Sequence, residues 1–451
     1  MLELLKGRQF EVRVILLAAT LALILTGIIT IYAVGHPRRL ALSEPVPSVV
    51  EGVEGNEPSS ATVQENPQPL PPAVSSDEQS SDLANLWKKQ LFFAMLGLGA
   101  LVLVNLVSYR WFGQLGYWIY GAVLVMLAVL LIDKFIELPF IPIINGSRRW
   151  IRIPLGFGSL NIQPSEICKP AYIIALAWYL RYRSNYRNFK ALIGPFILTL
   201  APMGLILLEP DLGTVLLMLP IFFAMVFAAG VKVRHLAVII LAALVISPLL
   251  WHGMQPYQRL RISSVLLQND WLRQKAEQHP ALGKILVGST FSTKRWKNDW
   301  AYHLIRSKYA VASGGTTGYG FGRGPFVKYD FLPERHNDFI FAIISHQWGF
   351  AGCVVVLSLY VLLFLCGLEI AVANTDPFGR LLAAGIVAMF AIQVIVNVMM
   401  TVGLMPITGI TLPLVSYGGS SLVITMACIG LLNNVGRWRP FTVAPRAFEN
   451  R

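Results

Sequence analysis

The segment FLPERHNDFIF, residues 331–341, places several ionisable side chains directly before a long apolar stretch. Glu334, Arg335, His336 and Asp338 all belong to it. Charges next to membrane hydrocarbon are costly, and they are retained mainly where they pair or carry out a function. Asp338 has the chemistry of a general base, which takes a proton from an attacking hydroxyl group. It could equally cap the helix that follows, since Asp is a common N-cap residue.

Three further ionisable residues occur at the ends of apolar stretches. Glu166 and Lys169, in QPSEICKP, are three positions apart and therefore share one face of a helix. They either form an ion pair that holds helices together or line a polar cavity. Asp211, in LEPDLGT, either caps the next helix or faces the same cavity. The sequence leaves both alternatives open.

Two polar segments between apolar stretches are strongly cationic. Residues 134–165 contain Arg148, Arg149 and Arg152 close together. Residues 252–337 carry 13 Lys and Arg against 5 Asp and Glu. Such an excess favours contact with anionic phosphate or lipid headgroups.

A single carboxylate beside a cationic surface suits one class of reaction. When the leaving group is a lipid-linked pyrophosphate, cations neutralise its charge and no acid has to protonate it. Only a base is then required. Ordinary glycoside hydrolysis protonates a sugar leaving group and generally needs two carboxylates. The glycine-rich stretch 313–324 adds no nucleotide site, because the Gly-Lys-Ser/Thr end of a P-loop is missing, and it predicts tight turns.

These residues must be positioned by membrane helices. Hydrophobic residues make up 55% of the chain and charged residues 14%, far from the balance of a soluble domain. Apolar stretches near the roughly 20 residues needed to span a bilayer recur along the chain. We predict an all-α polytopic membrane protein of about ten transmembrane helices, at 13–34, 90–109, 113–133, 166–182, 190–208, 212–229, 234–251, 338–368, 380–402 and 412–434.

The distribution of charge predicts the orientation of these helices. Basic clusters precede the first predicted helix and follow the fourth, sixth and tenth, which places both termini in the cytoplasm. The first apolar stretch is longer than a signal-peptide core and no clear cleavage site follows, which favours a retained helix. The cytoplasmic basic clusters explain the net charge of +13, so binding to nucleic acid is not needed to account for it. The four cysteines lie in predicted helices and are interpreted as small apolar residues.

The expected organisation has six parts. The loop 40–82, which is rich in Pro, Ser and Glu, is predicted to be disordered. It is either a simple tether or a docking segment for an extracytoplasmic partner. The other long loop, residues 252–337, is expected to be the large extracytoplasmic loop between predicted helices seven and eight. The parts are 1–39, the first helix with its cytoplasmic N-terminus; 40–82, the disordered extracytoplasmic loop; 83–251, helices two to seven; 252–337, the large extracytoplasmic loop; 338–436, helices eight to ten; and 437–451, the cytoplasmic tail.

The chain resembles the SEDS family, whose best-known members are RodA and FtsW. The resemblance extends from the first predicted helix to the tenth. It rests on GSRRWI, QPSEICK, EPDLGT, YQRLRI, SKYAVASGG, GYGFGRG, FLPERHNDFIFA and MPITGITLPLVSYGGSSL, in the order of the family. FLPERH and LPLVSYGG look closer to RodA, the elongation member, than to FtsW.

The resemblance implies a peptidoglycan glycosyltransferase that polymerises lipid II in the bacterial cytoplasmic (inner) membrane during cell elongation or division. It implies that Asp338 is the catalytic carboxylate. It further implies a substrate-binding set and a class B penicillin-binding protein as partner, besides membrane lipids. The expected substrate-binding residues are Glu166, Lys169, Asp211, Arg261, Lys308, Arg148 and Arg335.

The chain departs from the family pattern at two places. Asn337 stands where the family usually has Thr, and Ser345, His346 and Gln347 stand where it usually carries two Glu residues. No metal site is identified, and a divalent cation, Mg²⁺ or Mn²⁺, stays open as a cofactor. A lipid II flippase and a non-catalytic scaffold of the cell-wall synthesis complex are the alternative functions.

Overall fold

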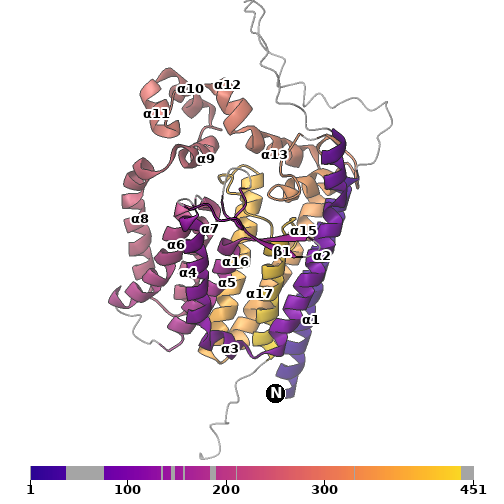
Figure 1. Cartoon of the computed structure of the whole chain (residues 1–451), viewed down its shortest axis with the longest axis vertical. Coiled ribbons are helices and arrows are strands. Elements are labelled where there is room, and N and C mark those ends of the chain that lie inside the picture. The colour runs from indigo at the N-terminus through magenta and orange to yellow at the C-terminus, as the bar shows by residue number, and fades with distance from the viewer. Residues whose placement is uncertain are drawn as a thin grey trace, which may run out of the picture.

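The computed structural model describes residues 2–36, 76–133, 136–143, 148–155, 158–182, 189–209, 211–329 and 331–437. Most of the predicted disordered loop, residues 40–75, and the predicted cytoplasmic tail from residue 438 lie outside these ranges. The described chain is mostly helical (Figure 1).

Each predicted membrane range is occupied by a long helix. The long helices are α1 (Leu2–Gly35), α2 (Ser76–Leu106), α4 (Gly116–Ile132), α5 (Pro164–Leu180), α6 (Ile193–Leu208), α7 (Leu212–Ala228), α8 (Val233–Gly253), α15 (Ile340–Ala373), α16 (Pro377–Thr401) and α17 (Gly419–Arg437). Within the described residues, six of them are long and apolar enough to cross a membrane: α1, α2, α8, α15, α16 and α17. The other four have 16 or 17 residues, so the count of ten spans stays a prediction.

Shorter elements fill the segments between the long helices. The segment 252–337 folds into a series of short helices, which lie together at the upper end of the molecule in Figure 1. The short elements are α3 (Tyr109–Gln114), β1 (Ile151–Leu155), β2 (Gly158–Ile162), a 3-10 turn (Phe189–Leu192), α9 (Pro256–Leu266), α10 (Asp270–Gln278), α11 (Pro280–Val287), α12 (Thr293–Arg295), a π-helical turn (Trp296–Trp300), α13 (Tyr302–Ser313) and α14 (Pro325–Lys328).

Three expectations need correction. The fold is not purely helical, because β1 and β2 form an antiparallel hairpin in which Ile151 pairs with Ile162. The predicted loop 40–82 ends early, since α2 begins at Ser76 and no Gly or Pro interrupts the chain before Gly97. The last long helix begins at Gly419 rather than at 412, because Pro413 lacks an N–H group and Leu414 has a φ of 70°.

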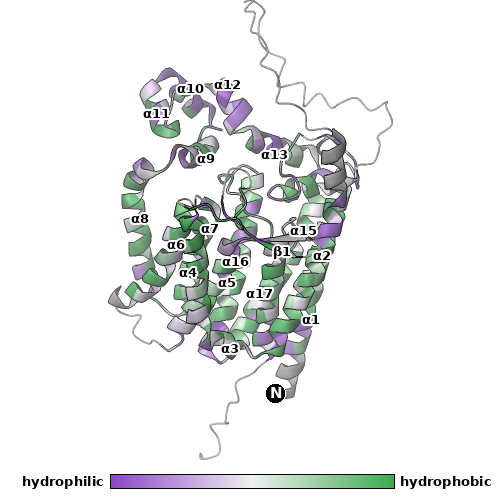
Figure 2. Ribbon diagram, viewed as in Figure 1, coloured by the Kyte–Doolittle hydropathy of each residue, from purple (hydrophilic) through white to green (hydrophobic). Residues whose placement is uncertain are grey.

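The long helices bury an apolar core and expose apolar residues around it. Figure 2 shows the bundle to be largely hydrophobic, while α10 and α12 are largely hydrophilic. Tyr172, Phe222 and Phe390 are among the fully buried side chains. Helix α8 differs from the rest, since almost all of its residues are exposed. This distribution is that of helices whose outer faces meet lipid.

The first and last helices meet at one end of the bundle. Arg13, near the start of α1, donates from Nε to Oδ1 of Asn433, near the end of α17, at 2.9 Å. Arg8 pairs with Glu369, close to the end of α15, at 2.6 Å. The start of α1 and the ends of α15 and α17 therefore lie on the same side, opposite the short helices of 252–337 (Figure 1).

The glycine-rich stretch 313–324 completes the hydrogen bonding of α15. Helix α15 is broken at Gly349, whose φ of 62° and ψ of −159° are not helical. The stretch lies against this break: the Tyr319 N–H donates to the His346 carbonyl at 3.0 Å, and the Phe350 N–H donates back to the stretch at 2.9 Å. The glycines thus allow a close approach of two backbones, besides the turns that the sequence predicted. The short helical segment that starts after Asp338 is held in place by this contact.

Two glycines of this stretch provide a matched test of that contact. Gly318 and Gly320 both have positive φ, 76° and 89°. A Cβ on Gly318 would lie 2.3 Å from the Gln347 carbonyl oxygen, whereas one on Gly320 would meet only the Arg323 side chain at 3.8 Å. We expect Gly320→Ala to cost about 1–2 kcal/mol through its φ alone, and Gly318→Ala to cost about 1–3 kcal/mol more through the clash. Thermal unfolding of the purified variants in detergent measures the difference. Equal melting temperatures would show that the stretch does not support α15.

Candidate active site

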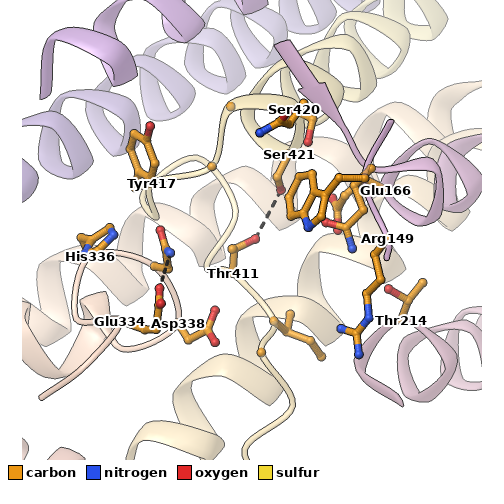
Figure 3. A pocket seen from close by; sticks show the side chains of 18 of the residues that line it. Arg149, Glu166, Thr214, Glu334, His336, Asp338, Thr411, Tyr417, Ser420 and Ser421 are labelled. Atoms are coloured by element: carbon orange, nitrogen blue, oxygen red, sulfur yellow. Dashed lines mark hydrogen bonds between the residues drawn. The ribbon is translucent and has the colours of Figure 1, made fainter. Parts of the chain in front are cut away.

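A cavity of about 1160 Å³ opens among the elements that carry the predicted chemistry. Its walls come from α2, the hairpin, α5, α7, α9, the loops 334–338 and 408–418 and the start of α17. Figure 3 shows part of this lining, including Arg149, Glu166, Asp338 and Ser421. Five of the eight predicted site residues line it: Glu166, Lys169, Asp211, Arg261 and Asp338.

Asp338 is half-buried at the wall of this cavity and does not cap α15. The N-cap residue of α15 is Phe339, and no side-chain cap hydrogen bond is present. The Asp338 carboxylate accepts no hydrogen bond from any residue that the structure describes. It lies against Gly409, where a Cβ would be 3.5 Å from Oδ2. The capping interpretation of Asp338 is therefore wrong, and its carboxylate is available to a ligand.

The backbone of Asp338 is held by hydrogen bonds from the neighbouring loop and from α16. The Asn397 amide donates to the Asp338 carbonyl at 2.9 Å and to the Ile410 carbonyl at 2.7 Å. The Ser416 hydroxyl donates to the Asn337 carbonyl at 2.7 Å. Each such bond contributes about 0.5–1.5 kcal/mol. These bonds hold the backbone of Asp338 in place and leave the oxygens of its carboxylate free of hydrogen bonds from the residues described.

The surroundings of Asp338 shift its pKa toward neutrality. Asp338 precedes the membrane-spanning part of α15, which begins at Ile340. Burial raises the pKa of Asp338 to about 7; the neighbouring Glu334 adds to the rise and Arg261 opposes it. A carboxyl group with such a pKa is an effective proton acceptor near neutral pH, because it is basic and still partly ionised.

Two arginines present positive charge to the cavity. Arg261 is half-buried, and its guanidinium donates no hydrogen bond to any residue in the described ranges. Burial and the nearby Arg149 lower the pKa of Arg261, but a guanidinium stays charged at neutral pH. Arg149 lines the same cavity and donates from Nε to the Glu209 carbonyl at 3.0 Å. Two cations that repel one another across a cavity form a site for an anion.

The wall formed by α5 and α7 is polar and internally paired. Lys169 and Glu166 form an ion pair of 2.7 Å, in which Lys169 is only 3% exposed. Asp211 is the N-cap of α7 and accepts from the Thr214 and Ser165 hydroxyls at 2.9 and 3.0 Å. The two alternatives raised by the sequence therefore coexist: these residues are structurally paired and also line the cavity.

The other three predicted residues lie outside the cavity lining. Lys308 donates to Gln268 at 2.7 Å, and Arg335 donates to the Phe326 and Tyr329 carbonyls at 3.2 and 2.7 Å. Arg148 is bound by acidic residues: it pairs with Asp133 at 3.0 Å and with Glu137 at 2.7 Å. Its neighbour Arg149 reaches the cavity instead.

Several lining residues were missed as site residues. Lys88 and Lys89 stand at the entrance to an apolar stretch, a position that the sequence shows without indicating a cavity. The hydroxyl-rich stretch SYGGSS, residues 416–421, contributes Ser420 and Ser421 to the lining as well. Within the described ranges, no three His, Cys, Asp or Glu side chains are grouped so that they could hold a metal ion.

Comparison with known proteins identifies the family. Peptidoglycan glycosyltransferase RodA of Treponema pallidum is 34% identical over 397 residues, covering 77% of this chain and 88% of the relative. A solved chain from a peptidoglycan synthase complex that coordinates polymerization and crosslinking matches 78% of this chain and 89% of its own length, with a TM-score of 0.60 and 33% identity. The crystal structure of Thermus thermophilus rod shape determining protein RodA matches 94% and 95%, with a TM-score of 0.56 and 28% identity.

The family model for cell cycle proteins of the FtsW, RodA and SpoVE type matches residues 72–439. This match covers well over half of the chain and confirms the family that the motifs indicated. The chain belongs to the FtsW/RodA/SpoVE family.

Proposed function

We propose that the chain is a peptidoglycan glycosyltransferase that polymerises lipid II, with Asp338 as the general base. One observation carries the proposal. The same cavity contains a carboxylate with a pKa of about 7 and a half-buried guanidinium, Arg261, and neither group has a hydrogen bond to a described residue. The family relatives, which are named peptidoglycan glycosyltransferases, support the reaction class.

The reaction uses the two groups for different tasks. Asp338 takes the proton from the 4-hydroxyl of the acceptor GlcNAc, and that oxygen attacks the anomeric carbon of the donor MurNAc. The bond from this carbon to the pyrophosphate breaks, and undecaprenyl pyrophosphate leaves with inversion. Arg261 and Arg149 neutralise the leaving pyrophosphate, so no acid is required. Arg149 replaces Arg148, which the family resemblance implied as a substrate-binding residue and which is paired with Asp133 and Glu137.

The paired polar wall has a supporting part. Glu166, Lys169 and Asp211 offer charged and hydrogen-bonding atoms to the sugar hydroxyls. The ion pair between Glu166 and Lys169, and the hydroxyl donors of Asp211, keep them in fixed positions. Lys308 and Arg335 lie outside the cavity lining and serve the site through the outer segments that they hold together.

We further propose ten membrane helices with both termini in the cytoplasm of a bacterium and the segment 252–337 outside the cytoplasmic (inner) membrane. The common location of the α1 start and the α17 end on one side of the bundle supports an even number of crossings. A class B penicillin-binding protein is the proposed partner. The likeness to a chain from a synthase complex of polymerization and crosslinking supports it.

The change Asp338→Asn tests the base directly. Asn keeps the size and polarity of Asp and cannot accept the proton. We expect folded protein whose polymerisation falls about a hundredfold to ten-thousandfold. Glycan length is measured from labelled lipid II in detergent, where a transporter has no two sides to work across. Asp299→Asn, on the exposed π-helical turn, is the matched control and should polymerise normally.

Other outcomes of that experiment reassign the function. Normal polymerisation by Asp338→Asn would move the base to another residue, of which Glu334 is the first to test. A wild-type protein that makes no polymer, even with a class B penicillin-binding protein present, would favour the flippase or the scaffold.

The pH profile tests how the surroundings tune Asp338. Because the base must be ionised, turnover should rise with pH and level off above the pKa of Asp338, about 7. Glu334→Gln removes a charge that raises this pKa, so the midpoint should move to lower pH. Arg261→Gln removes a charge that lowers it, so the midpoint should move to higher pH. Initial rates across the pH range measure both shifts. A midpoint that stays the same in both variants contradicts Asp338 as the titrating base.

Accessibility to a membrane-impermeant thiol reagent tests the orientation. The four native cysteines are buried and should react little. We expect Ser289→Cys, exposed in the segment 252–337, to react in intact cells, and Thr375→Cys, exposed between α15 and α16, to react only after lysis. The reverse pattern would invert the topology.

A further inference from the structure

One face of the β1–β2 hairpin lines the cavity. In the register of the hairpin, Arg152 stands opposite Asn161. Side chains alternate between the two faces of a strand, so a residue two positions along from either one shares its face. These residues are Trp150, just before β1, and Gln163, whose backbone continues β2 in an extended conformation. Trp150, Asn161 and Gln163 all line the cavity.

The opposite face of the hairpin is apolar. It carries Ile151, Ile153 and Ile162, and none of these three side chains lines the cavity. Ile153 is 41% exposed. The hairpin is therefore amphipathic, with its aromatic and amide side chains on the cavity side and its isoleucines on the other.

The two amides on the cavity face offer one available acceptor and one available donor. Gln163 donates from Nε2 to the Ser165 hydroxyl at 2.9 Å and to the Asp211 carboxylate at 3.4 Å. Its Oε1 accepts no hydrogen bond from any described residue. Asn161 has the reverse arrangement: its Oδ1 accepts from Nε of Arg152 at 3.3 Å, and its Nδ2 donates to none of the residues described. The pair can therefore serve a ligand group that has both a carbonyl and an N–H, as an acetamido group has.

Trp150 adds an aromatic surface beside these amides. The flat face of an indole ring is apolar, while its N–H can donate a hydrogen bond. Arg152, the charged residue on this face, is exposed and does not line the cavity. The lining part of the face is thus uncharged. It suits a neutral ligand group with an apolar side and several hydrogen-bonding atoms, which is the chemistry of a sugar ring.

We propose that Trp150, Asn161 and Gln163 bind the sugar attached to the donor pyrophosphate, with its ring against Trp150 and its 2-acetamido group at the two amides. This proposal rests on the polymerase function proposed above. Arg149, which neutralises the leaving pyrophosphate in that reaction, is the residue before Trp150. The first sugar of the donor is bonded directly to the pyrophosphate. A ring site next to Arg149 therefore takes the first sugar and not the second.

Three lipids that differ by one group at a time test this site at equilibrium, without polymerisation. They are undecaprenyl pyrophosphate, the same lipid with glucose, and the same lipid with N-acetylglucosamine. We expect purified wild type in detergent to bind the glucose lipid about tenfold more tightly than the sugar-free lipid. The N-acetylglucosamine lipid should bind about tenfold more tightly again. The first gain measures the ring, and the second measures the acetamido group.

Each variant should lose one of the two gains. Trp150→Leu removes the aromatic surface and should abolish most of the gain from glucose, whereas Trp150→Tyr should keep this gain within about threefold. Asn161→Ala removes the available donor and should reduce the gain from the acetamido group about twofold to tenfold. Ile153→Thr, on the other face of the same hairpin, is the matched control and should keep both gains.

The sugar-free lipid separates sugar binding from a structural part of the hairpin. The proposal requires that its affinity stay within about twofold of wild type in Asn161→Ala. If Trp150→Leu weakens all three lipids because the hairpin shifts, the result for Asn161→Ala decides. Equal weakening of all three lipids in both variants would overturn the proposal and make the face a support for Arg149. Two variants that keep both gains would also overturn it.

The wild-type measurements distinguish failure of this site from failure of the polymerase function. Wild type that binds none of the three lipids would contradict the polymerase function. Wild type that binds undecaprenyl pyrophosphate but gains nothing from either sugar would contradict the sugar site alone.

Discussion

Asn397 joins the two loops between which the proposed chemistry takes place. Its amide donates both to the carbonyl of Asp338 and to the carbonyl of Ile410, so the start of α15 and the loop 408–411 cannot move independently. Because this bridge uses backbone carbonyls, it leaves the Asp338 carboxylate free of protein hydrogen bonds. A carboxylate held in this way is positioned by its backbone and tuned only by burial and by neighbouring charge.

The charged residues of the cavity fall into two groups, which differ in whether other protein groups pair with them. Glu166 with Lys169, and Asp211 with its hydroxyl donors, are satisfied within the protein and cost little to keep buried. Asp338 and Arg261 lack such partners, and burial penalises the charged form of both. The unsatisfied groups are those that a substrate with a hydroxyl and a pyrophosphate would satisfy. Binding of such a substrate would thus offset the free-energy cost of keeping these two charged groups buried without partners.

The segment 252–337 is connected to this site through α15, which its glycine-rich stretch contacts. The break at Gly349 leaves backbone groups of the helix without helical partners, and the glycine-rich stretch supplies them. The first part of α15, which follows Asp338 directly, is therefore held between this stretch on one side and Asn397 on the other. Any contact that moved the stretch would move the helix start with it.

The sequence alone predicted the helical ranges, the family and five residues that line the cavity. Apolar length and composition decide which segments become membrane helices, so the predicted ranges and the observed helices agree closely. Asp338, Arg261, Asp211, Glu166 and Lys169 were all found from their motifs, and all five line one cavity.

The tertiary structure alone decided which neighbouring side chain faces that cavity. Arg148 and Arg149 are adjacent in the chain; the acidic pair Asp133 and Glu137 holds the first away, and the Glu209 carbonyl holds the second at the cavity. Lys88 and Ser420 were missed for the same reason, since they come together only through the contact of α2 with α17. Such contacts join residues far apart in sequence, and local patterns of residue type contain no information about them.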